Sequence, residues 1–266
     1  MDPATPAEMP GDTLRSISRE DMAKLPIRRY AGKLCVVATP HDLAQALADL
    51  RAEAVVGLDT ETRPAFRKGE AHLPCLAQAA TAHAVYLFPL RHRDAHPVLA
   101  ELLAEPRIVK AGVGLAHDLR ALKQVFAFVE KNVLDLGGVA RSSGLGQSGV
   151  RNLAGMFLGF RIPKGGSTSN WAAQELTAAQ ITYAATDAWA CRELFLRFQS
   201  LGMLRAKPAP AASGAATGGR RPGLPRNIPG RERRAGPPPE AHAMAALRPI
   251  RDTHTLCASF PARPPC

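Results

Sequence analysis

The stretch Val55-Val56-Gly57-Leu58-Asp59-Thr60-Glu61-Thr62 decides how the rest of this chain is interpreted. It opens as an apolar run with two β-branched valines, which is typical of a buried strand. Asp59 and Glu61 stand two residues apart, so along a strand both carboxylates point to one face, about 6.5–7 Å apart. Two acids on a buried face lose hydration and repel each other, so they need a compensating cation. A divalent metal ion with oxygen ligands is the simplest such cation.

A purely structural role for the two acids is the alternative. One acid could cap a following helix, and the other could pair with Arg63 or Arg67, which follow in the sequence. The stretch alone does not separate this role from a metal site, and the decision depends on residues elsewhere in the chain.

The elements predicted around this strand give an α/β fold with a mixed sheet. Three strands close together, at 55–62, 75–80 and 84–90, indicate an antiparallel meander. Helices and strands alternate after that, which places helices on the faces of the sheet. The further strands are expected at 33–38, 108–111 and 132–136. The helices are expected after a cap at Ser18 and ending before Pro26, and at about 41–51, 96–103, 116–126, 137–142, 150–157 and 177–204.

Composition restricts the class of protein. No run of about 18 or more apolar residues occurs, so no transmembrane helix and no membrane partner is expected. The N-terminus lacks the apolar core of a secretory signal. Five scattered cysteines without CxxC pairing favour a reducing, cytoplasmic location over a disulfide framework or a zinc site, namely Cys35, Cys75, Cys191, Cys257 and Cys266.

Charge and low complexity divide the chain into parts. The net charge is +11, of which +8 falls in residues 205–266 and only +3 in residues 1–204. Residues 206–266 are rich in Ala, Gly, Pro and Arg and are predicted to be a disordered tail, with at most weak contact to nucleic acid or protein. Residues 1–29 are expected to be a leader with a short helix, and 30–205 the folded domain.

Two later segments carry further acids. Asp118 follows a strand and a glycine turn and lies in the first turn of a helix, where an anion is favoured. Tyr183 and Asp187 are at i and i+4, so both project from one face of the last helix. Each feature also has an ordinary explanation, a first-turn acid in one case and a simple hydrogen-bonded pair in the other.

Together these segments resemble the three exonuclease motifs of the DEDD superfamily. The tyrosine marks the DEDDy branch, which includes ribonuclease D and the exonuclease domain of the Werner helicase. The resemblance covers about residues 30–204. It is carried by Leu58-Asp59-Thr60-Glu61-Thr62, Asp118, Ser169-Asn170-Trp171 ahead of Leu176-Thr177, Gln180, and Tyr183-Ala184-Ala185-Thr186-Asp187-Ala188.

The resemblance implies a ribonuclease H-like mixed sheet and a metal-dependent 3′→5′ exonuclease. Two Mg²⁺ or Mn²⁺ ions would be held by Asp59, Glu61, Asp118 and Asp187, and Tyr183 would orient the attacking water. The substrate would be the 3′ end of DNA or RNA, released as 5′-mononucleotides. The sequence leaves open which nucleic acid is used.

Other residues and other functions stay as alternatives. Arg67, Lys68 and Lys164 could guide phosphates, whereas Trp171 is expected to be a core anchor and Asp135 a structural cap. A catalytically weak nucleic-acid-binding or interaction module of the same fold is the alternative function. A ribonuclease H or transposase-type site is disfavoured by the Asp-x-Glu spacing and by the tyrosine helix.

Overall fold

The computed structural model describes residues 15–67, 69–164, 166 and 168–204. Residues 1–14 of the predicted leader, Lys68 and the predicted tail 206–266 lie outside the described residues. The division into leader, domain and tail therefore stays a prediction.

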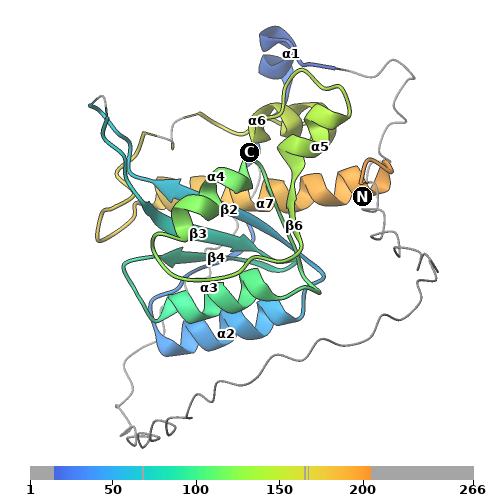
Figure 1. Ribbon diagram of the computed structural model, residues 1–266. Helices are drawn as coiled ribbons and strands as arrows, with labels where there is room; N and C mark the ends of the chain where they lie inside the picture. The colour runs from blue at the N-terminus through green and yellow to red at the C-terminus, as the bar shows by residue number, and fades with distance from the viewer. Residues whose placement is uncertain (1–14, 68, 165, 167, 205–266) are drawn as a thin grey trace, which may run out of the picture. The chain divides into compact units, whose positions relative to one another are not determined.

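Six strands form one mixed sheet, in the order β1-β4-β3-β2-β5-β6 (Figure 1). β2, β3 and β4 run antiparallel, which confirms the predicted meander. β1 pairs parallel with β4, and β5 and β6 continue parallel to β2 on the other side. The strands are β1 (Lys33–Val36), β2 (Val55–Thr62), β3 (Pro74–Ala80), β4 (Ala84–Pro89), β5 (Val109–Gly112) and β6 (Val133–Asp135).

Helices cover both faces of this sheet, which confirms the α/β class. α2 and α3 pack together on one face, and the long helix α7 packs against β2, β3, β4 and β5 on the other (Figure 1). The helices are α1 (Arg19–Lys24), α2 (Pro40–Arg51), α3 (Ala95–Ala104), α4 (Leu115–Leu122), α5 (Leu136–Ser142), α6 (Val150–Leu153), the π-helix η1 (Ala154–Leu158) and α7 (Ala178–Ser200). Among the described residues, no helix combines the length and apolar character needed to span a bilayer.

β2 presents different residues to the two faces of the sheet. Val56 and Leu58 lie in the core cluster that α2, α3 and α4 complete. Gly57 lies against the backbone of α7. Because side chains alternate along a strand, Asp59 and Glu61 share the face of Gly57 and lie on the α7 side. The strand thus turns its acids toward the helix that carries Asp187.

Position 57 allows α7 to approach β2 closely. A Cβ atom at this position would overlap the carbonyl oxygen of Ala188 and lie 2.7 Å from the backbone nitrogen of Arg192. Only glycine leaves room for this contact without a shift of the helix.

Three helices differ from their predicted bounds or type by more than a single residue at an end. The helix predicted at 116–126 ends at Leu122, and the chain then turns so that the Phe126 ring stacks on His96 at 4.9 Å. The segment predicted as one helix at 150–157 is α6 followed by a π-helix, which stops at Gly159 with φ +69°. α7 is shorter at both ends than the predicted 177–204, since Thr177 is its N-cap. Local sequence patterns do not contain the tertiary packing that sets these ends.

Candidate active site

Three carboxylates from two elements converge at the junction of β2 and α7. One oxygen each from Asp59, Glu61 and Asp187 lies within 4.8 Å of the others. Glu61 is 8% exposed and Asp187 5% exposed, while Asp59 is half-buried. Strand alternation supplies the first two acids, and the approach of α7 over Gly57 supplies the third. The structure therefore brings together three of the four acids predicted as metal ligands.

Asp118 reaches the same area from the opposite face of the sheet and is not one of the three convergent acids. It lies in the first turn of α4, and its carboxylate accepts a hydrogen bond from the Thr60 hydroxyl. Thr60 alternates with Asp59 and Glu61 along β2, so its side chain points to the α4 side. The charge of Asp118 still acts on Asp59 and Glu61. Asp118 thus borders the three-carboxylate group.

Burial raises the pKa of every acid in this area, and repulsion from the other acids adds to it at Asp59 and Glu61. Burial, together with the charges of Asp187, Glu61 and Asp118, raises the pKa of Asp59 well above its ordinary value. Burial and the charges of Asp187 and Asp118 raise the pKa of Glu61 to about 8. Burial also raises the pKa values of Asp118 and Asp187 to about 6. Such a site is unfavourable for ionised acids on their own and favourable for a bound cation.

The donor set fits a hard divalent cation. All three convergent ligands offer carboxylate oxygens, and the buried Oδ1 of Asp187 has no hydrogen-bond partner among the described residues. Oxygen ligands of this kind suit Mg²⁺ or Mn²⁺ rather than Zn²⁺, which prefers nitrogen and sulfur.

Tyr183 packs beside these acids. Its hydroxyl donates a hydrogen bond to the Asp187 carboxylate, one helical turn further along α7. Its ring lies 6.1 Å from that of Trp171 and packs against Gly166, where a Cβ atom would overlap the ring. Burial and the nearby carboxylates raise its pKa above the ordinary value, so the phenol stays protonated at neutral pH. It can orient a water molecule but is not a base.

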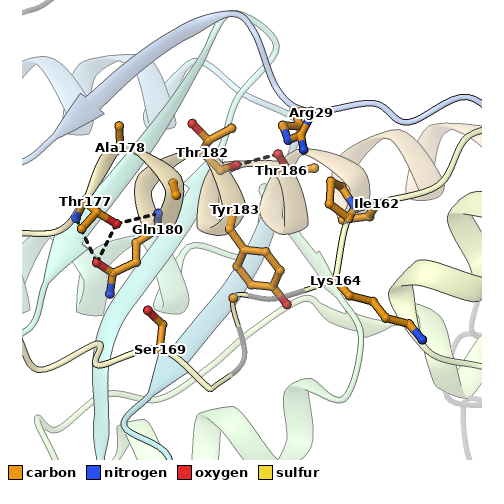
Figure 2. A pocket seen from close by; sticks show the side chains of 13 residues that line it. Arg29, Ile162, Lys164, Ser169, Thr177, Ala178, Gln180, Thr182, Tyr183 and Thr186 are labelled. Atoms are coloured by element: carbon orange, nitrogen blue, oxygen red, sulfur yellow. Dashed lines mark hydrogen bonds between the residues drawn. The ribbon is translucent and has the colours of Figure 1, made fainter.

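Tyr183 borders a cavity of about 490 Å³. Figure 2 shows Tyr183 in its wall, between α7 and the segment that carries Lys164 and Ser169. Arg29, from the segment before β1, borders the cavity on the other side of α7. None of the four predicted metal ligands lines it.

Two residues near the acids were not predicted from the sequence. The positive charge of Arg151 in α6 lowers the pKa of Asp187 and so opposes the effect of burial. Gln78 of β3 pairs with Asp59 of β2 in the antiparallel register and is fully buried. A glutamine within the otherwise apolar strand predicted at 75–80 could have indicated a polar residue near the acids. Nothing in the sequence linked Arg151 to Asp187.

The structural expectations for two further residues are confirmed. Asp135 is the N-cap of α5 and accepts hydrogen bonds from the backbone nitrogens of Gly137, at 2.9 Å, and Gly114, at 3.0 Å. Trp171 is 1% exposed and packs in the core between the sheet and α7. Arg67 is exposed, and its backbone nitrogen donates to Glu70, so a role in guiding phosphates stays a prediction.

Known proteins are similar to this chain in sequence and in fold. A family model described as 3′-5′ exonuclease matches residues 35–202. Ribonuclease D of Haemophilus influenzae is 33% identical over 141 residues, which are 52% of this chain and 34% of that protein. A 3′-5′ exonuclease of Arabidopsis thaliana is 27% identical over 198 residues, covering 67% of this chain and 68% of the relative. The chain thus spans about a third of the ribonuclease D that it matches.

Solved structures agree with the sequence matches. Ribonuclease D of Escherichia coli superimposes with a TM-score of 0.56 at 25% identity, over 64% of this chain and 46% of that one. The Nibbler EXO domain of Aedes aegypti has a TM-score of 0.57 at 21% identity, over 64% of this chain and 89% of that domain, and supports the fold. With the family match over residues 35–202, these findings show that the chain belongs to the 3′-5′ exonuclease family.

Proposed function

We propose that this chain hydrolyses phosphodiester bonds at the 3′ end of RNA and releases 5′-mononucleotides. The observation that carries the proposal is the convergence of Asp59, Glu61 and Asp187 beside a hydrogen-bonded Tyr183. RNA is favoured over DNA because relatives that match at 31–33% identity are named ribonuclease D. In each turnover, water adds to the terminal phosphorus and the bond to the 3′ oxygen of the preceding nucleotide breaks.

The acids are proposed to hold two Mg²⁺ or Mn²⁺ ions. Asp59, Glu61 and Asp187 would provide most of the ligands, and Asp118 would complete the site from the α4 side. Bound divalent ions supply positive charge that stabilises the attacking and departing oxygens at phosphorus. The raised pKa values of the metal-free acids support this role, because a nearby cation would restore their ionised form.

Tyr183 is proposed to orient the attacking water. Its hydroxyl donates to Asp187, which leaves the phenol oxygen able to accept a hydrogen bond from water. Gly166 and Trp171 hold the ring, so the oxygen is fixed before substrate arrives. Positioning of this kind lowers the entropic part of the barrier without proton transfer to the tyrosine.

The test uses the purified chain with 5′-labelled RNA and DNA strands in Mg²⁺, Mn²⁺ or EDTA. We expect a ladder of strands shortened from the 3′ end, faster on RNA and absent in EDTA. Asp59→Asn and Asp187→Asn should each abolish the ladder while the folded structure is kept. Asp94→Asn is the matched control, since this exposed N-cap residue makes no capping hydrogen bond.

Two results would contradict the proposal. Substantial hydrolysis by Asp59→Asn or Asp187→Asn would place the reaction at another site. Binding of nucleic acid without hydrolysis under any metal condition would favour the alternative of a binding module. A cytoplasmic location and the predicted domain boundaries remain predictions.

A further inference from the structure

Two basic residues from distant parts of the sequence border the cavity beside Tyr183. Arg29 precedes β1, and Lys164 follows η1. The cavity wall along α7 runs from Thr177 to Thr186 and stops before Asp187. The cavity therefore adjoins the carboxylate site at Tyr183 and extends away from it along the first half of α7.

The backbone around Arg29 is fixed on both sides. Before it, the nitrogen of Arg28 donates to the oxygen of Arg161 at 3.1 Å, and the nitrogen of Arg161 donates to Pro26 at 2.9 Å. After it, the nitrogen of Tyr30 donates to the Thr186 hydroxyl at 3.0 Å. These bonds tie residues 26–30 to α7 and to the chain at residue 161. Arg29 is thus held at the rim of the cavity although its side chain is exposed.

Among the residues that the structure describes, neither basic residue at the rim has an acidic partner. Within the described part of the chain, no ion pair involves Arg29 or Lys164, and both side chains are exposed. Some other cations of this domain are paired, such as Arg51 with Glu101 and Arg192 with Glu53. Two unpaired positive charges at one cavity favour an anionic ligand.

The lining between the two cations is mixed. It offers hydroxyl groups from Ser169, Thr177, Thr182 and Tyr183 beside the apolar surfaces of residues such as Ile162. A volume of about 490 Å³ lies within the usual range for sites that hold an organic ligand. Hydroxyls, apolar surface and cations together match the hydroxyls, base and phosphate of a nucleotide unit.

We propose that this cavity binds the part of the strand on the 5′ side of the bond that is cleaved. Arg29 and Lys164 neutralise its backbone phosphates. Only one nucleotide lies on the 3′ side of that bond, whereas the remaining strand must continue away from the carboxylates, as the cavity does. The assignment rests on the proposed function for the position of the cleaved bond.

Binding is measured without hydrolysis, in EDTA, by fluorescence anisotropy of a 5′-labelled single strand of RNA of about ten nucleotides. Arg29→Gln and Lys164→Gln should each weaken binding about twofold to fivefold, the range of an exposed ion pair. Each should lower the slope of log K against log salt concentration by about 0.7, the contribution of one phosphate contact on a single strand. Arg93→Gln is the matched control, since Arg93 is exposed and lies away from the cavity.

The second measurement compares hydrolysis of RNA substrates of two lengths. A dinucleoside monophosphate has no phosphate on the 5′ side of the cleaved bond. The Arg29→Gln and Lys164→Gln variants should therefore hydrolyse it like the unaltered protein, whereas the KM for a strand of about ten nucleotides should rise. Equal losses on both substrates, or a salt slope unchanged from that of Arg93→Gln, would overturn the inference. The unaltered protein could bind RNA without hydrolysing it, while Arg29→Gln and Lys164→Gln still weaken binding and lower the salt slope. That result would sustain this inference and contradict the proposed function.

Discussion

Gly57 of β2 and Ala188 of α7 lie so close that no side chain fits between the strand and the helix. Asp59 and Glu61 follow Gly57 on the same face of β2, and Asp187 precedes Ala188 on α7. The distance between the two groups of acids is therefore set by a backbone contact next to them.

Gly57→Ala should lower the free energy of unfolding by about 3 kcal/mol, since the added methyl group overlaps backbone atoms that cannot rotate away. It should also reduce hydrolysis, because α7 can admit the methyl group only by moving Asp187 away from Asp59. Urea unfolding and initial rates measure the two effects. Gly149→Ala is the control, because no atom lies within 4 Å of a Cβ there and φ is −78°. A fully stable and active Gly57→Ala would show that the contact does not set the spacing.

Gln78→Met should raise the free energy of unfolding of the metal-free protein by about 1–2 kcal/mol. Gln78 is fully buried, and neither polar atom of its amide has a hydrogen-bond partner among the described residues. Methionine keeps a similar shape without the cost of an unsatisfied amide. Thermal and urea unfolding in EDTA test the change. A loss of stability would mean that the amide is hydrogen-bonded in solution and supports Asp59, its partner across the strands.

The metal-free protein should lose stability as the pH rises from about 5 to about 7.5. The pKa of Glu61 is about 8 against an ordinary 4.5, so the folded state binds this proton more tightly than the unfolded state. Its contribution is complete below the ordinary pKa and is lost as the pH rises through the folded value. Asp118 and Asp187, with pKa values of about 6, act in the same direction. Lys110, with a pKa lowered to about 8 by burial, changes stability only at higher pH.

Urea unfolding in EDTA at several pH values measures this slope. Glu61→Gln should flatten it, since the neutral amide has no proton to lose, and Mg²⁺ should flatten it by stabilising the ionised acids. A stability that increases with pH over this range would contradict the raised pKa values.

Tyr183→Phe should lower kcat about tenfold to a hundredfold, because the attacking water loses a fixed partner. The Mg²⁺ concentration that gives half-maximal rate should change little, since the carboxylates remain. Single-turnover kinetics over a metal titration separate the two quantities. Tyr30→Phe is the matched control, since that hydroxyl donates to the backbone oxygen of Lys33, away from the acids. An unchanged rate in Tyr183→Phe would exclude the tyrosine from the reaction.

The strands and the face from which each acid projects were predictable because they depend on short-range periodicity, whereas the convergence of β2 and α7 was expected only from the family resemblance. Alternation placed Asp59 and Glu61 on one face, and the i, i+4 spacing placed Tyr183 beside Asp187, whose carboxylate accepts its hydrogen bond. The cap at Asp135 was predictable for the same reason, since its hydrogen bond to Gly137 spans two residues.

Features that depend on contacts between distant segments were not predictable. The position of Asp118 on the α4 side follows from its hydrogen bond to Thr60, which no local pattern contains. Arg29 reaches the cavity only because residues 26–30 are tied to α7 and to Arg161. The end of α4 at Leu122 reflects the packing of Phe126 on His96.

The fixed contact between β2 and α7 has a consequence for how such a domain can diversify. Asp59, Glu61, Tyr183 and Asp187 stand on a strand and a helix whose separation a glycine sets, whereas Arg29 and Lys164 stand on connecting segments outside both. The exposed side chains of Arg29 and Lys164 can be exchanged without moving the acids. Preference among substrates can therefore evolve, or be engineered, separately from the hydrolytic step, by replacing Arg29 or Lys164 while Gly166, the strand and the helix are left untouched.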